Sequence, residues 1–495
     1  MRGRETGTPS KTGAPTGTIA GEGSAAEPEP AVFGAPYPPY DAPSFASFAE
    51  LVAYLGEAFP DRVAFERAEG ERVTYRRLVE TIAQVETEFE RDAVGRWVDV
   101  RDQDPVRFAV RYLAATASGR CAVLCPLDTA QRAALELPAS DAVPDGATVP
   151  ESVRTVVASS GTSGDPKAVM LSEAGILADL NSGLELYRFA DGARYAKLLP
   201  YTHAFGLVCD LLAPLVTGGT ICLPHSPATF AAELPGMTVD ALNLPPRAAG
   251  MLAQALEGTR YRLPTLGKIL CGGAGLPSAL TRRLRAHGVE AFGCYGLTEC
   301  SPCVTVNRDA WRKDGSCGVA LACNEVATAP DGSILVRGAN VMAGYLGRPD
   351  LTAARLSSDG WLRTGDVGRI DADGFLYVDG RTDDLIVLSD GTKVSPEPLE
   401  RTLQEHPAVA EALVFGAGDE GSRVLGCRLV LRKTSGTEVD GTAGAASAAS
   451  TTVAVSGAIE FARSLCSPQG ARIELVEVSE DPLPRTPAGK IRRQA

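Results

Sequence analysis

The pattern that most restricts the fold of this chain is a repeated alternation of short apolar runs, turns and helical stretches. The segments are residues 239–244, Pro245-Pro246, a helical stretch at 247–256, Lys268–Cys271, the turn at 272–275, a helix with Leu280 and Leu284 on one face, and residues 289–294. Ser278 is predicted as the N-cap of that last helix. This repetition predicts an α/β layered domain whose ligand-binding loops lie at the carboxyl ends of the strands.

The pattern of apolar runs, turns and helical stretches changes after Asp383. Residues 385–388 form an apolar run, Asp390-Gly391 marks a turn, a helix opens near Ser395, and further apolar runs follow. This order predicts a smaller α+β domain. A chain of 495 residues is also too long for one compact core, so at least two domains are expected.

Two segments have little to bury. Residues 1–44 consist mainly of Pro, Gly, Thr, Ala and Glu, and we predict a disordered tail there. Residues 434–457 are rich in Ala, Ser, Thr and Gly, which indicates a surface loop within the last domain. The N-terminus lacks the apolar core of a signal peptide.

Charge and cysteine content argue against several classes of function. The net charge of −13 disfavours a nucleic-acid or membrane-surface role, so an anionic ligand needs a local group of donors. The most apolar stretch, residues 207–223, is interrupted by Asp210 and Pro214 and does not predict a membrane span. Cys300 and Cys303 form a lone CxxC, and the 12 cysteines are interpreted as small buried thiols of a cytoplasmic protein rather than as metal ligands.

A segment rich in Gly, Ser and Thr, residues 159–171 (SSGTSGDPKAVML), directly follows the predicted strand Val153–Ala158. Glycines let the backbone turn tightly and expose amide N–H groups, hydroxyls add donors, and Lys167 adds a full positive charge. The segment suits a polyphosphate, although it lacks the GK[ST] sequence of a Walker loop. On its own it is equally compatible with a plain loop.

Four further motifs carry groups that a nucleotide needs. Residues 295–299 (YGLTE) supply a ring, a hydroxyl and a carboxylate, which can stack on a base, hold a phosphate oxygen and bind Mg²⁺. Asp366, in residues 361–366 (WLRTGD), can accept both hydroxyls of a ribose. Alone, the first motif would be a strand end with an exposed acid, and the second a turn. Residues 380–384 (GRTDD) and 484–490 (PRTPAGK) complete the set.

These five segments in this order resemble the adenylate-forming superfamily of acyl-CoA synthetases, stand-alone adenylation domains and luciferases. The resemblance runs from about Phe48 to the C-terminus. It implies an acyl-CoA synthetase of the α/β class, with a large layered N-terminal domain at residues 45–382 and a smaller α+β C-terminal lid domain at residues 383–495. Its substrates and cofactors would be a small carboxylic acid, ATP, Mg²⁺ and CoA.

The resemblance also implies roles for individual residues. Lys490 would reach the substrate carboxylate and the α-phosphate during adenylation and then swing away for thioester formation, with Asp383 as the hinge. Glu299 would hold Mg²⁺, and Thr298 would touch the α-phosphate. The remaining nucleotide contacts would come from the pyrophosphate cradle (Thr162, Ser163, Gly164, Lys167), the adenine bracket (Gly273, Ala274, Tyr295) and the ribose pair (Asp366, Arg381).

His203 falls where acyl- and aryl-CoA synthetases of this family often carry a His beside the acyl pocket. A His in an apolar run is also compatible with a satisfied core residue. Amino-acid-loading adenylation domains carry a Phe-Asp pair in this region, which this chain lacks, since Asp210 lies too far on. The resemblance therefore implies a hydrophobic acid without an α-amino group, in a pocket lined by His203, Phe205, Val208, Gly273, Cys294 and Cys303.

CoA is the favoured thiol acceptor, and the phosphopantetheine of a carrier protein is the alternative. Gly391 matches the segment that lines the pantetheine tunnel in CoA-using members, and Lys393 would lie on the same CoA side. The chain shows no insertion at the domain junction of the kind found in fatty-acyl-AMP ligases, which do not use CoA.

The chain departs from the family pattern at Ala168, where the family usually has Gly after Pro-Lys. If that position needs φ > 0, Ala costs about 1 kcal/mol or more and displaces Lys167. The segment before the phosphate loop is also shorter than usual. These departures motivate a second hypothesis, an enzyme that forms only the thioester from an adenylate made by a partner enzyme. A third, a nucleotide-binding regulator built on an inactive synthetase, predicts loss of Lys490, Glu299 or Asp366, and all three are present.

Overall fold

The computed structural model describes residues 42–124, 149–159, 167–187, 191–226, 229–258, 263, 265–273, 275–308, 310, 313–419, 422–432, 444–467 and 470–484. The chain divides into two compact units. The first consists of Met1–Pro330, Ile334–Thr364 and Ile370–Tyr377, and the second of Asp331–Ser333, Gly365–Arg369 and Val378–Ala495. The prediction of a large α/β part followed by a smaller part is confirmed, whereas the predicted boundaries at residues 45 and 383 remain predictions.

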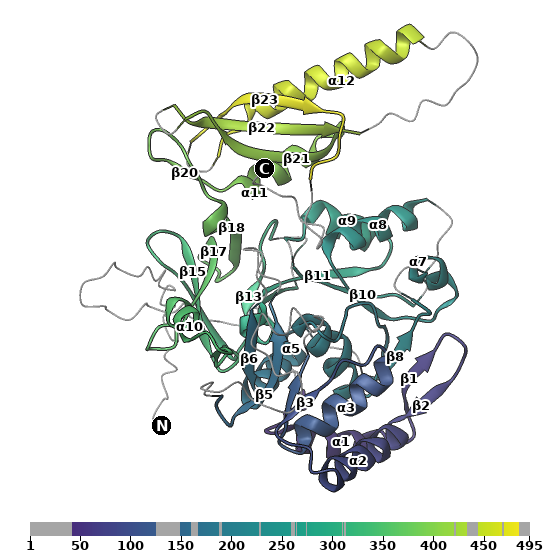
Figure 1. The fold of residues 1–495 in the computed structure, drawn as a ribbon. Helices are drawn as coiled ribbons and strands as arrows, with labels where there is room; N and C mark the ends of the chain where they lie inside the picture. The colour runs from purple at the N-terminus through teal and green to yellow at the C-terminus, as the bar shows by residue number, and fades with distance from the viewer. Residues whose placement is uncertain are drawn as a thin grey trace, which may run out of the picture. The chain divides into compact units, whose positions relative to one another are not determined.

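The main sheet of the first unit has the strand order β13-β12-β11-β10-β9-β7-β8-β1-β2 (Figure 1). The strands are β13 (Val319–Ala320), β12 (Cys303–Asn307), β11 (Glu290–Gly296), β10 (Lys268–Cys271), β9 (Ala241–Leu244), β7 (Arg194–Ala196), β8 (Thr220–Leu223), β1 (Val63–Arg67) and β2 (Arg72–Thr74). Its central strands β7, β9, β10 and β11 are parallel. Their short apolar sequences are almost wholly buried, as expected of parallel strands covered on both faces.

Helices cover this sheet. α8 (Pro246–Glu257) and α9 (Ser278–Ala286) contact each other and pack on β9, β10 and β11 (Figure 1). The prediction of Ser278 as an N-cap is wrong. Pro277 takes the extended cap position because its ring fixes φ, and Ser278 is the first helical residue. The buried Ser278 hydroxyl instead accepts a hydrogen bond from Arg282 Nη1 at 2.9 Å.

The N-terminal helices form a layer of their own. α1 (Phe48–Ala58), α2 (Tyr75–Arg91) and α3 (Pro105–Ala117) pack against one another (Figure 1). Tyr75 anchors this layer to the main sheet region, because its fully buried hydroxyl donates to the carbonyl oxygens of Leu215 (3.0 Å) and Gly219 (2.7 Å).

A second sheet of the first unit has the order β16-β6-β5-β4-β3. Its strands are β16 (Gly344–Tyr345), β6 (Ala168–Ser172), β5 (Val153–Ala158), β4 (Cys121–Val123) and β3 (Trp97–Asp99), and α5 (Glu173–Tyr187) packs on β5 and β6. β5 has the bounds that the sequence predicts. β16 pairs antiparallel with β6, with Tyr345 opposite Val169, although the two strands lie far apart in the chain.

The first unit also contains several short helical elements. They are η1 (Gly206–Leu212), α6 (Ala213–Val216), α7 (Phe230–Glu233), η2 (Leu234–Gly236), η3 (Thr298–Cys300) and α10 (Pro349–Arg355). A further sheet has the order β14-β15-β17-β18. Its strands are β14 (Asn324–Thr328), β15 (Ser333–Gly338), β17 (Leu362–Ile370) and β18 (Leu376–Arg381), and the division between the units falls within three of them.

The second unit has the α+β composition that the sequence predicts. Its elements are η4 (Thr382–Asp384), β19 (Ile386–Val387), β20 (Lys393–Val394), α11 (Pro396–Glu405), β21 (Val409–Ala417), β22 (Val424–Leu431), α12 (Gly444–Ser464) and β23 (Ile473–Ser479). The prediction of a surface loop over residues 434–457 is wrong from Gly444 onward, because α12 begins there. Alanine is the strongest helix former, and Ala458 and Ala462 are fully buried in the core of this unit.

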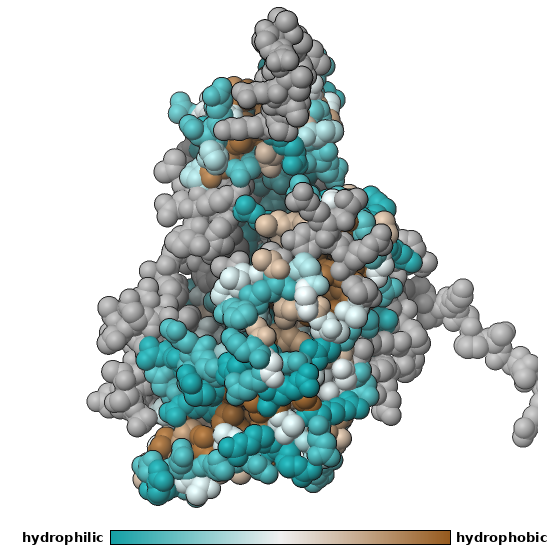
Figure 2. Space-filling view, turned by 90° about the vertical axis from the view of Figure 1, so that its right-hand side faces the viewer, coloured by the Kyte–Doolittle hydropathy of each residue, from teal (hydrophilic) through white to brown (hydrophobic). Residues whose placement is uncertain are grey.

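The face drawn in Figure 2 is mostly hydrophilic, and its hydrophobic residues reach the surface in patches bordered by hydrophilic ones. No helix among the described residues combines the length and the hydrophobicity that crossing a bilayer requires.

Candidate active site

The predicted site residues of the first unit follow its parallel strands. Gly273 comes two residues after β10, Tyr295 lies at the end of β11, and His203 follows β7 through a short loop. β7, β9, β10 and β11 run parallel, so their carboxyl ends lie at one edge of the sheet. Ligands of open α/β sheets bind at this edge. The structure thus brings these predicted residues to one side of the sheet.

Glu299 and Lys167 meet at a residue that the sequence reasoning missed, Tyr345. The Tyr345 hydroxyl donates a hydrogen bond to Glu299 Oε1 at 2.9 Å. Lys167 Nζ lies 5.4 Å from the centroid of the same ring. The backbone amide of Met342 donates a hydrogen bond to the backbone carbonyl oxygen of Glu299 at 2.8 Å. Tyr345 could not be paired with Glu299 from the sequence, because it comes 46 residues later and belongs to a strand, β16, that is placed by its pairing with β6.

The donor set suits Mg²⁺ bound together with phosphates. The described residues contain no group of three or more His, Cys, Asp or Glu side chains that could hold a metal ion by themselves. Mg²⁺ commonly uses one or two protein carboxylates, with water and substrate phosphates as its other ligands. A single carboxylate at Glu299 with a lysine nearby fits this pattern.

Ala168 adopts an ordinary strand conformation. It is the first residue of β6 and pairs with Ala158 of β5. Its carbonyl oxygen accepts the Leu346 amide at 2.9 Å. Extended backbone is open to any L-residue, so alanine causes no left-handed strain here.

A buried network supports the turn that carries Thr298 and Glu299. Asp179, on α5, accepts hydrogen bonds from the Cys303 amide (2.9 Å) and from Asn340 Nδ2 (3.1 Å). Asn340 Nδ2 also donates to the carbonyl oxygens of Cys300 and Cys303, both at 2.8 Å. Burial raises the pKa of Asp179 well above its usual value. Neither residue could be predicted, because each lies outside the motif that it supports.

Several predicted acyl-pocket residues lie together. A Cβ added at Gly272 would be 2.8 Å from Cys294 Sγ and 2.9 Å from Phe205 Cζ, so these two side chains meet over Gly272. Val208 lies buried on the π-helical turn η1, and Gly273 is exposed beside Gly272.

Buried thiols extend this group. Cys209, a residue that was not predicted, is hydrogen-bonded to Cys303, as is Cys294. These hydrogen bonds, together with burial, raise the pKa of Cys209 and Cys294 well above its usual value, so both remain neutral thiols at neutral pH. Cys209 and Cys294 therefore add no charge to this group.

His203 stands where the loop after β7 enters η1. Its amide donates to the Pro200 carbonyl at 3.1 Å, and its own carbonyl accepts the Leu207 amide at 2.9 Å. Part of the imidazole reaches the surface, whereas the protein around the rest of the ring desolvates it and lowers its pKa. The ring is therefore neutral at neutral pH.

Asp366 and Arg381, the predicted ribose pair, contact each other in the second unit. Arg381 Nη1 donates to Asp366 Oδ1 at 3.0 Å, and the Asp366 side chain is largely buried. Asp383 lies in η4 with 71% of its side chain exposed, and Arg381 Nη2 lies 3.8 Å from its Oδ2. Gly391 forms the turn between β19 and β20 with φ of 82°, and Lys393 is the exposed first residue of β20.

Some predicted residues lie outside the described part of the chain. They are Thr162, Ser163 and Gly164 of the phosphate loop, Ala274 of the adenine bracket and Lys490 near the C-terminus. Their roles remain predictions. The residues on either side of the phosphate loop are described, and the Ser159 amide donates to the Lys167 carbonyl at 2.8 Å, which closes the base of the loop.

Gly296 allows the turn of Thr298 and Glu299 to approach β11 closely. A Cβ at this position would lie 2.0 Å from the Pro302 carbonyl oxygen. Gly296→Ala is expected to lower the melting temperature by several degrees, because backbone must shift and such overpacking costs about 1–3 kcal/mol. Gly183→Ala in α5 is the matched control, since no atom lies within 4 Å of its added Cβ, and it should leave stability equal or slightly higher. An unchanged melting temperature for Gly296→Ala would contradict the close approach.

Burial raises the pKa of Asp210 from 3.8 to about 6. A raised folded-state pKa gives stability that is fully present below the unfolded value and is lost as pH rises through about 6. The melting temperature of the wild type should therefore fall relative to that of Asp210→Asn between pH 5.5 and pH 7.5, a range above the isoelectric point of about 5.0. Parallel pH profiles of the two proteins would show that Asp210 does not titrate in this range.

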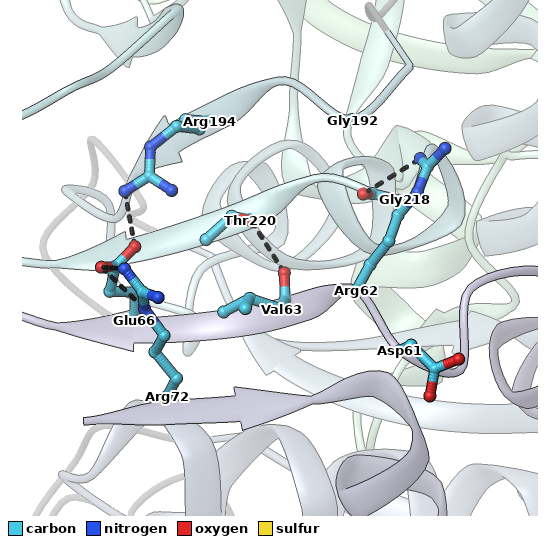
Figure 3. Close-up of a pocket in the computed structure, with 9 residues that line it drawn as sticks. All are labelled: Asp61, Arg62, Val63, Glu66, Arg72, Gly192, Arg194, Gly218 and Thr220. Atoms are coloured by element: carbon cyan, nitrogen blue, oxygen red, sulfur yellow. Dashed lines mark hydrogen bonds and ion pairs between the residues drawn. The ribbon is translucent and has the colours of Figure 1, made fainter. Parts of the chain in front are cut away.

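A polar cleft of about 380 Å³ lies at the opposite edge of the main sheet (Figure 3). Arg194, Thr220 and Val63 line it, and they are the first residues of β7, β8 and β1. Its arginines are already paired: Arg194 and Arg72 both bind Glu66, at 2.6 and 3.0 Å, and Arg62 binds Asp191 at 2.7 Å. The cleft is thus separate from the strand ends that carry the predicted site.

Comparison with curated proteins identifies relatives that are CoA ligases. The chain is 32% identical to indoleacetate–CoA ligase of Aromatoleum aromaticum over 296 residues, which cover 57% of this chain and 58% of that protein. It is 34% identical to 2-succinylbenzoate–CoA ligase of Bacillus subtilis over 296 residues (57% and 60%), and 32% identical to feruloyl-CoA synthase of Amycolatopsis sp over 320 residues (61% and 64%). The matched region thus spans 58% to 64% of the length of these relatives.

Solved structures share the fold over most of the chain. O-succinylbenzoate coenzyme A synthetase from Bacillus subtilis, in complex with AMP, matches with a TM-score of 0.69 and 25% identity over 90% of this chain and 97% of that one. Amide bond synthetase McbA from Marinactinospora thermotolerans matches with a TM-score of 0.72 and 23% identity over 90% and 98%.

Family models identify both parts of the chain. The model of the AMP-binding enzyme matches residues 96–346, which is 251 of 495 residues, and the model of the AMP-binding enzyme C-terminal domain matches residues 383–495. The resemblance to adenylate-forming enzymes is thereby confirmed, and the chain belongs to the AMP-binding enzyme family.

Proposed function

We propose that this chain is an AMP-forming acid–thiol ligase that activates a hydrophobic carboxylic acid without an α-amino group and transfers the acyl group to CoA. The observation that carries the proposal is the meeting of Lys167 and Glu299 at Tyr345. A lysine directly before β6 and a carboxylate in η3, both in contact with Tyr345, suit a polyphosphate with its metal ion. The CoA ligases among the relatives support the acid–thiol class.

The first half-reaction joins two anions. An oxygen of the substrate carboxylate attacks the α-phosphorus of ATP, the bond to pyrophosphate breaks, and an acyl-adenylate forms. Lys167 and the backbone of the phosphate loop would bind the pyrophosphate oxygens, and Thr298 would donate its hydroxyl to the α-phosphate. Glu299 would hold Mg²⁺, which neutralises phosphate charge when it is bound. Lys490 would bring the second positive charge to the carboxylate.

In the second half-reaction the sulfur of CoA attacks the acyl carbon, AMP leaves, and a thioester forms. Carboxyl adenylates react readily because AMP is a good leaving group. The same site has to lose the Lys490 side chain and admit a thiol between the two steps, which is why we assign Asp383 as a hinge and Gly391 and Lys393 to the CoA side.

The acyl side of the site favours an apolar substrate. Phe205 and Val208 are apolar, and the buried Cys294 thiol stays neutral because its pKa is raised well above the usual value. His203 is neutral at neutral pH, because desolvation lowers its pKa, and it can donate or accept one hydrogen bond without adding charge. No residue assigned to this side offers a carboxylate for a substrate ammonium group.

Thioester formation alone, from an adenylate made by a partner enzyme, was motivated by Ala168. The extended conformation of Ala168 removes the backbone strain on which that motive depended. Transfer to the phosphopantetheine of a carrier protein remains the alternative to CoA. The experiment below distinguishes the two by offering each acceptor separately.

The test is a panel of aromatic and aliphatic acids incubated with ATP and Mg²⁺, and each acid is measured in two ways. Pyrophosphate release reports the first half-reaction, and mass spectrometry of the thioester reports the second, with CoA or a phosphopantetheinylated carrier protein as acceptor. We expect acid-dependent pyrophosphate release and an acyl-CoA product for at least one hydrophobic acid.

Other outcomes identify the alternatives. Thioester from a synthetic adenylate without pyrophosphate release from any acid would favour the half-reaction enzyme. Acylation of the carrier protein alone would replace CoA as the acceptor. Nucleotide binding without either product would contradict an enzymatic role.

A further inference from the structure

Asp210 is a buried carboxylate in the π-helical turn η1, and the residue is only 2% exposed. Its Oδ2 accepts the amide N–H groups of Leu198 (3.1 Å) and Leu199 (2.8 Å). Its Oδ1 accepts Asn243 Nδ2 at 2.6 Å. All three partners are donors, which suits an ionised carboxylate, since only the ionised form accepts through both oxygens without a proton to place. Three hydrogen bonds offset the cost of burying the charge.

These hydrogen bonds join three segments. Leu198 and Leu199 follow the end of β7, Asn243 lies in the neighbouring strand β9, and Asp210 belongs to η1. Asn243 Nδ2 also donates to the Cys209 carbonyl at 2.8 Å, which attaches η1 to β9 a second time. The loop from Leu198 to His203 is therefore held at its start by Asp210, and it ends in the turn that contains Asp210.

The groups around Asp210 restrict this loop further. Lys197, which precedes the anchored amides, places its Nζ 5.1 Å from the centroid of the Tyr201 ring. Tyr201 is buried, and its ring packs on Phe108 with the centroids 5.5 Å apart. Lys197 is attracted to the Asp210 charge. The part of the loop that precedes His203 is thus fixed by the Asp210 carboxylate, by the Lys197 cation and by an aromatic pair.

We propose that Asp210 is a positioning residue, which holds the loop of Leu198–His203 so that His203 is presented to the acyl substrate. The role rests on the proposed function, since His203 is assigned to the acyl side by resemblance. Asp210 does not contact the reacting atoms. It acts through the two amides, and its loss leaves the nucleotide side of the site, built by β6, η3 and β16, unchanged.

Two substitutions test the anchor in graded steps. Asp210→Ala removes all three hydrogen bonds, so kcat/KM for the acid should fall about 100-fold, as expected for a misplacement of about 1 Å, while KM for ATP stays within about threefold. Asp210→Asn keeps an oxygen for the two amides. Its NH₂ group, however, faces the NH₂ group of Asn243, and turning Asn243 over costs the bond to Cys209. The loss should therefore be smaller, about tenfold.

Asp240→Ala is the matched control. Asp240 Oδ2 accepts the Arg194 amide at 2.8 Å, so it anchors the opposite end of β7, away from the site. We expect a lower melting temperature with unchanged kcat/KM for the acid. Hydrogen–deuterium exchange of residues 197–203 gives a readout that is independent of activity: it should accelerate in Asp210→Ala, less in Asp210→Asn, and stay as in the wild type in Asp240→Ala.

The outcomes separate this proposal from the proposed function. Faster exchange of residues 197–203 with an unchanged kcat/KM for the acid would overturn the positioning role, and unchanged exchange would overturn the anchor itself. Equal losses in Asp210→Ala and Asp210→Asn would overturn the role of the two amides. If Asp210→Ala does not fold, the kcat/KM for the acid and the exchange of residues 197–203 are compared between Asp210→Asn and the wild type, and unchanged values of both overturn the positioning role. A wild type that forms neither pyrophosphate nor thioester refutes the proposed function, and the role of the loop with it, whereas the exchange data still decide the anchor.

Discussion

Glu299→Gln is expected to reduce acid-dependent pyrophosphate release by about 100- to 1000-fold, because it removes the one protein charge assigned to Mg²⁺ while preserving the shape of the side chain. The glutamine carbonyl can still accept the Tyr345 hydroxyl that now donates to Glu299 Oε1 at 2.9 Å, so the turn should keep its fold. The measurement is steady-state pyrophosphate release at several Mg²⁺ concentrations. Half-saturation by Mg²⁺ should shift to higher concentration in the variant.

Two controls accompany this variant. Tyr345→Phe removes the hydroxyl that donates to Glu299, and loss of such an outer partner typically costs about tenfold to 100-fold. Glu325→Gln removes a carboxylate of the same unit that pairs with Arg337 at 2.8 Å on β14 and β15, and it should keep full activity. An active Glu299→Gln enzyme with unaltered Mg²⁺ dependence would refute the metal assignment.

Lys490→Ala should affect the two half-reactions unequally. Adenylation should fall about 1000-fold, because the charge that offsets repulsion between the carboxylate and the triphosphate is lost. Thioester formation from a synthetic acyl-adenylate and CoA should stay near the wild-type rate, since we assign that step to a state in which Lys490 has left the site. The two half-reactions are measured separately, by pyrophosphate release and by the appearance of acyl-CoA.

Arg463→Ala, at an exposed cation on α12 of the same unit, is the control for Lys490→Ala and should affect neither half-reaction. Equal loss of both half-reactions in Lys490→Ala would contradict a lysine that serves only adenylation. Full adenylation activity would show that another cation meets the substrate carboxylate.

Local patterns predicted much of the fold because they act over short distances. β5 and β10 have the predicted bounds, since apolar runs of 6 and 4 residues between turn residues have the length of a buried strand and are short for a helix. The segment at residues 434–457 was misinterpreted because a composition of Ala, Ser, Thr and Gly suits a loop as well as a helix. Burial of Ala458 and Ala462 against the second unit, which no local pattern shows, stabilises α12.

Site residues could be predicted where the reactive groups lie within one sequence motif. They could not be predicted where a motif is completed by a residue from a distant part of the chain. Glu299 and Lys167 could be selected from their motifs, whereas Tyr345 belongs to a two-residue strand whose place depends on pairing with β6. Asp179 and Asn340 were missed for the same reason. From the sequence, Asp210 was noted only as a break in the apolar stretch 207–223 and as lying too far along the chain to bind a substrate ammonium group. Its bonds to Leu198, Leu199 and Asn243 depend on how β7, η1 and β9 fold together.

The pairing of β6 with β16 affects how the chain folds while the ribosome is still synthesising it. Tyr345 lies opposite Val169 in the sheet, so β6 must wait for a partner made 176 positions later (345 − 169). At typical elongation rates this delay is roughly 10 to 35 seconds, during which an apolar strand edge has no neighbour. We expect nascent chains released before Tyr345 to be sensitive to protease and to recruit chaperones, and the yield of folded enzyme in a foreign host to follow the supply of those chaperones.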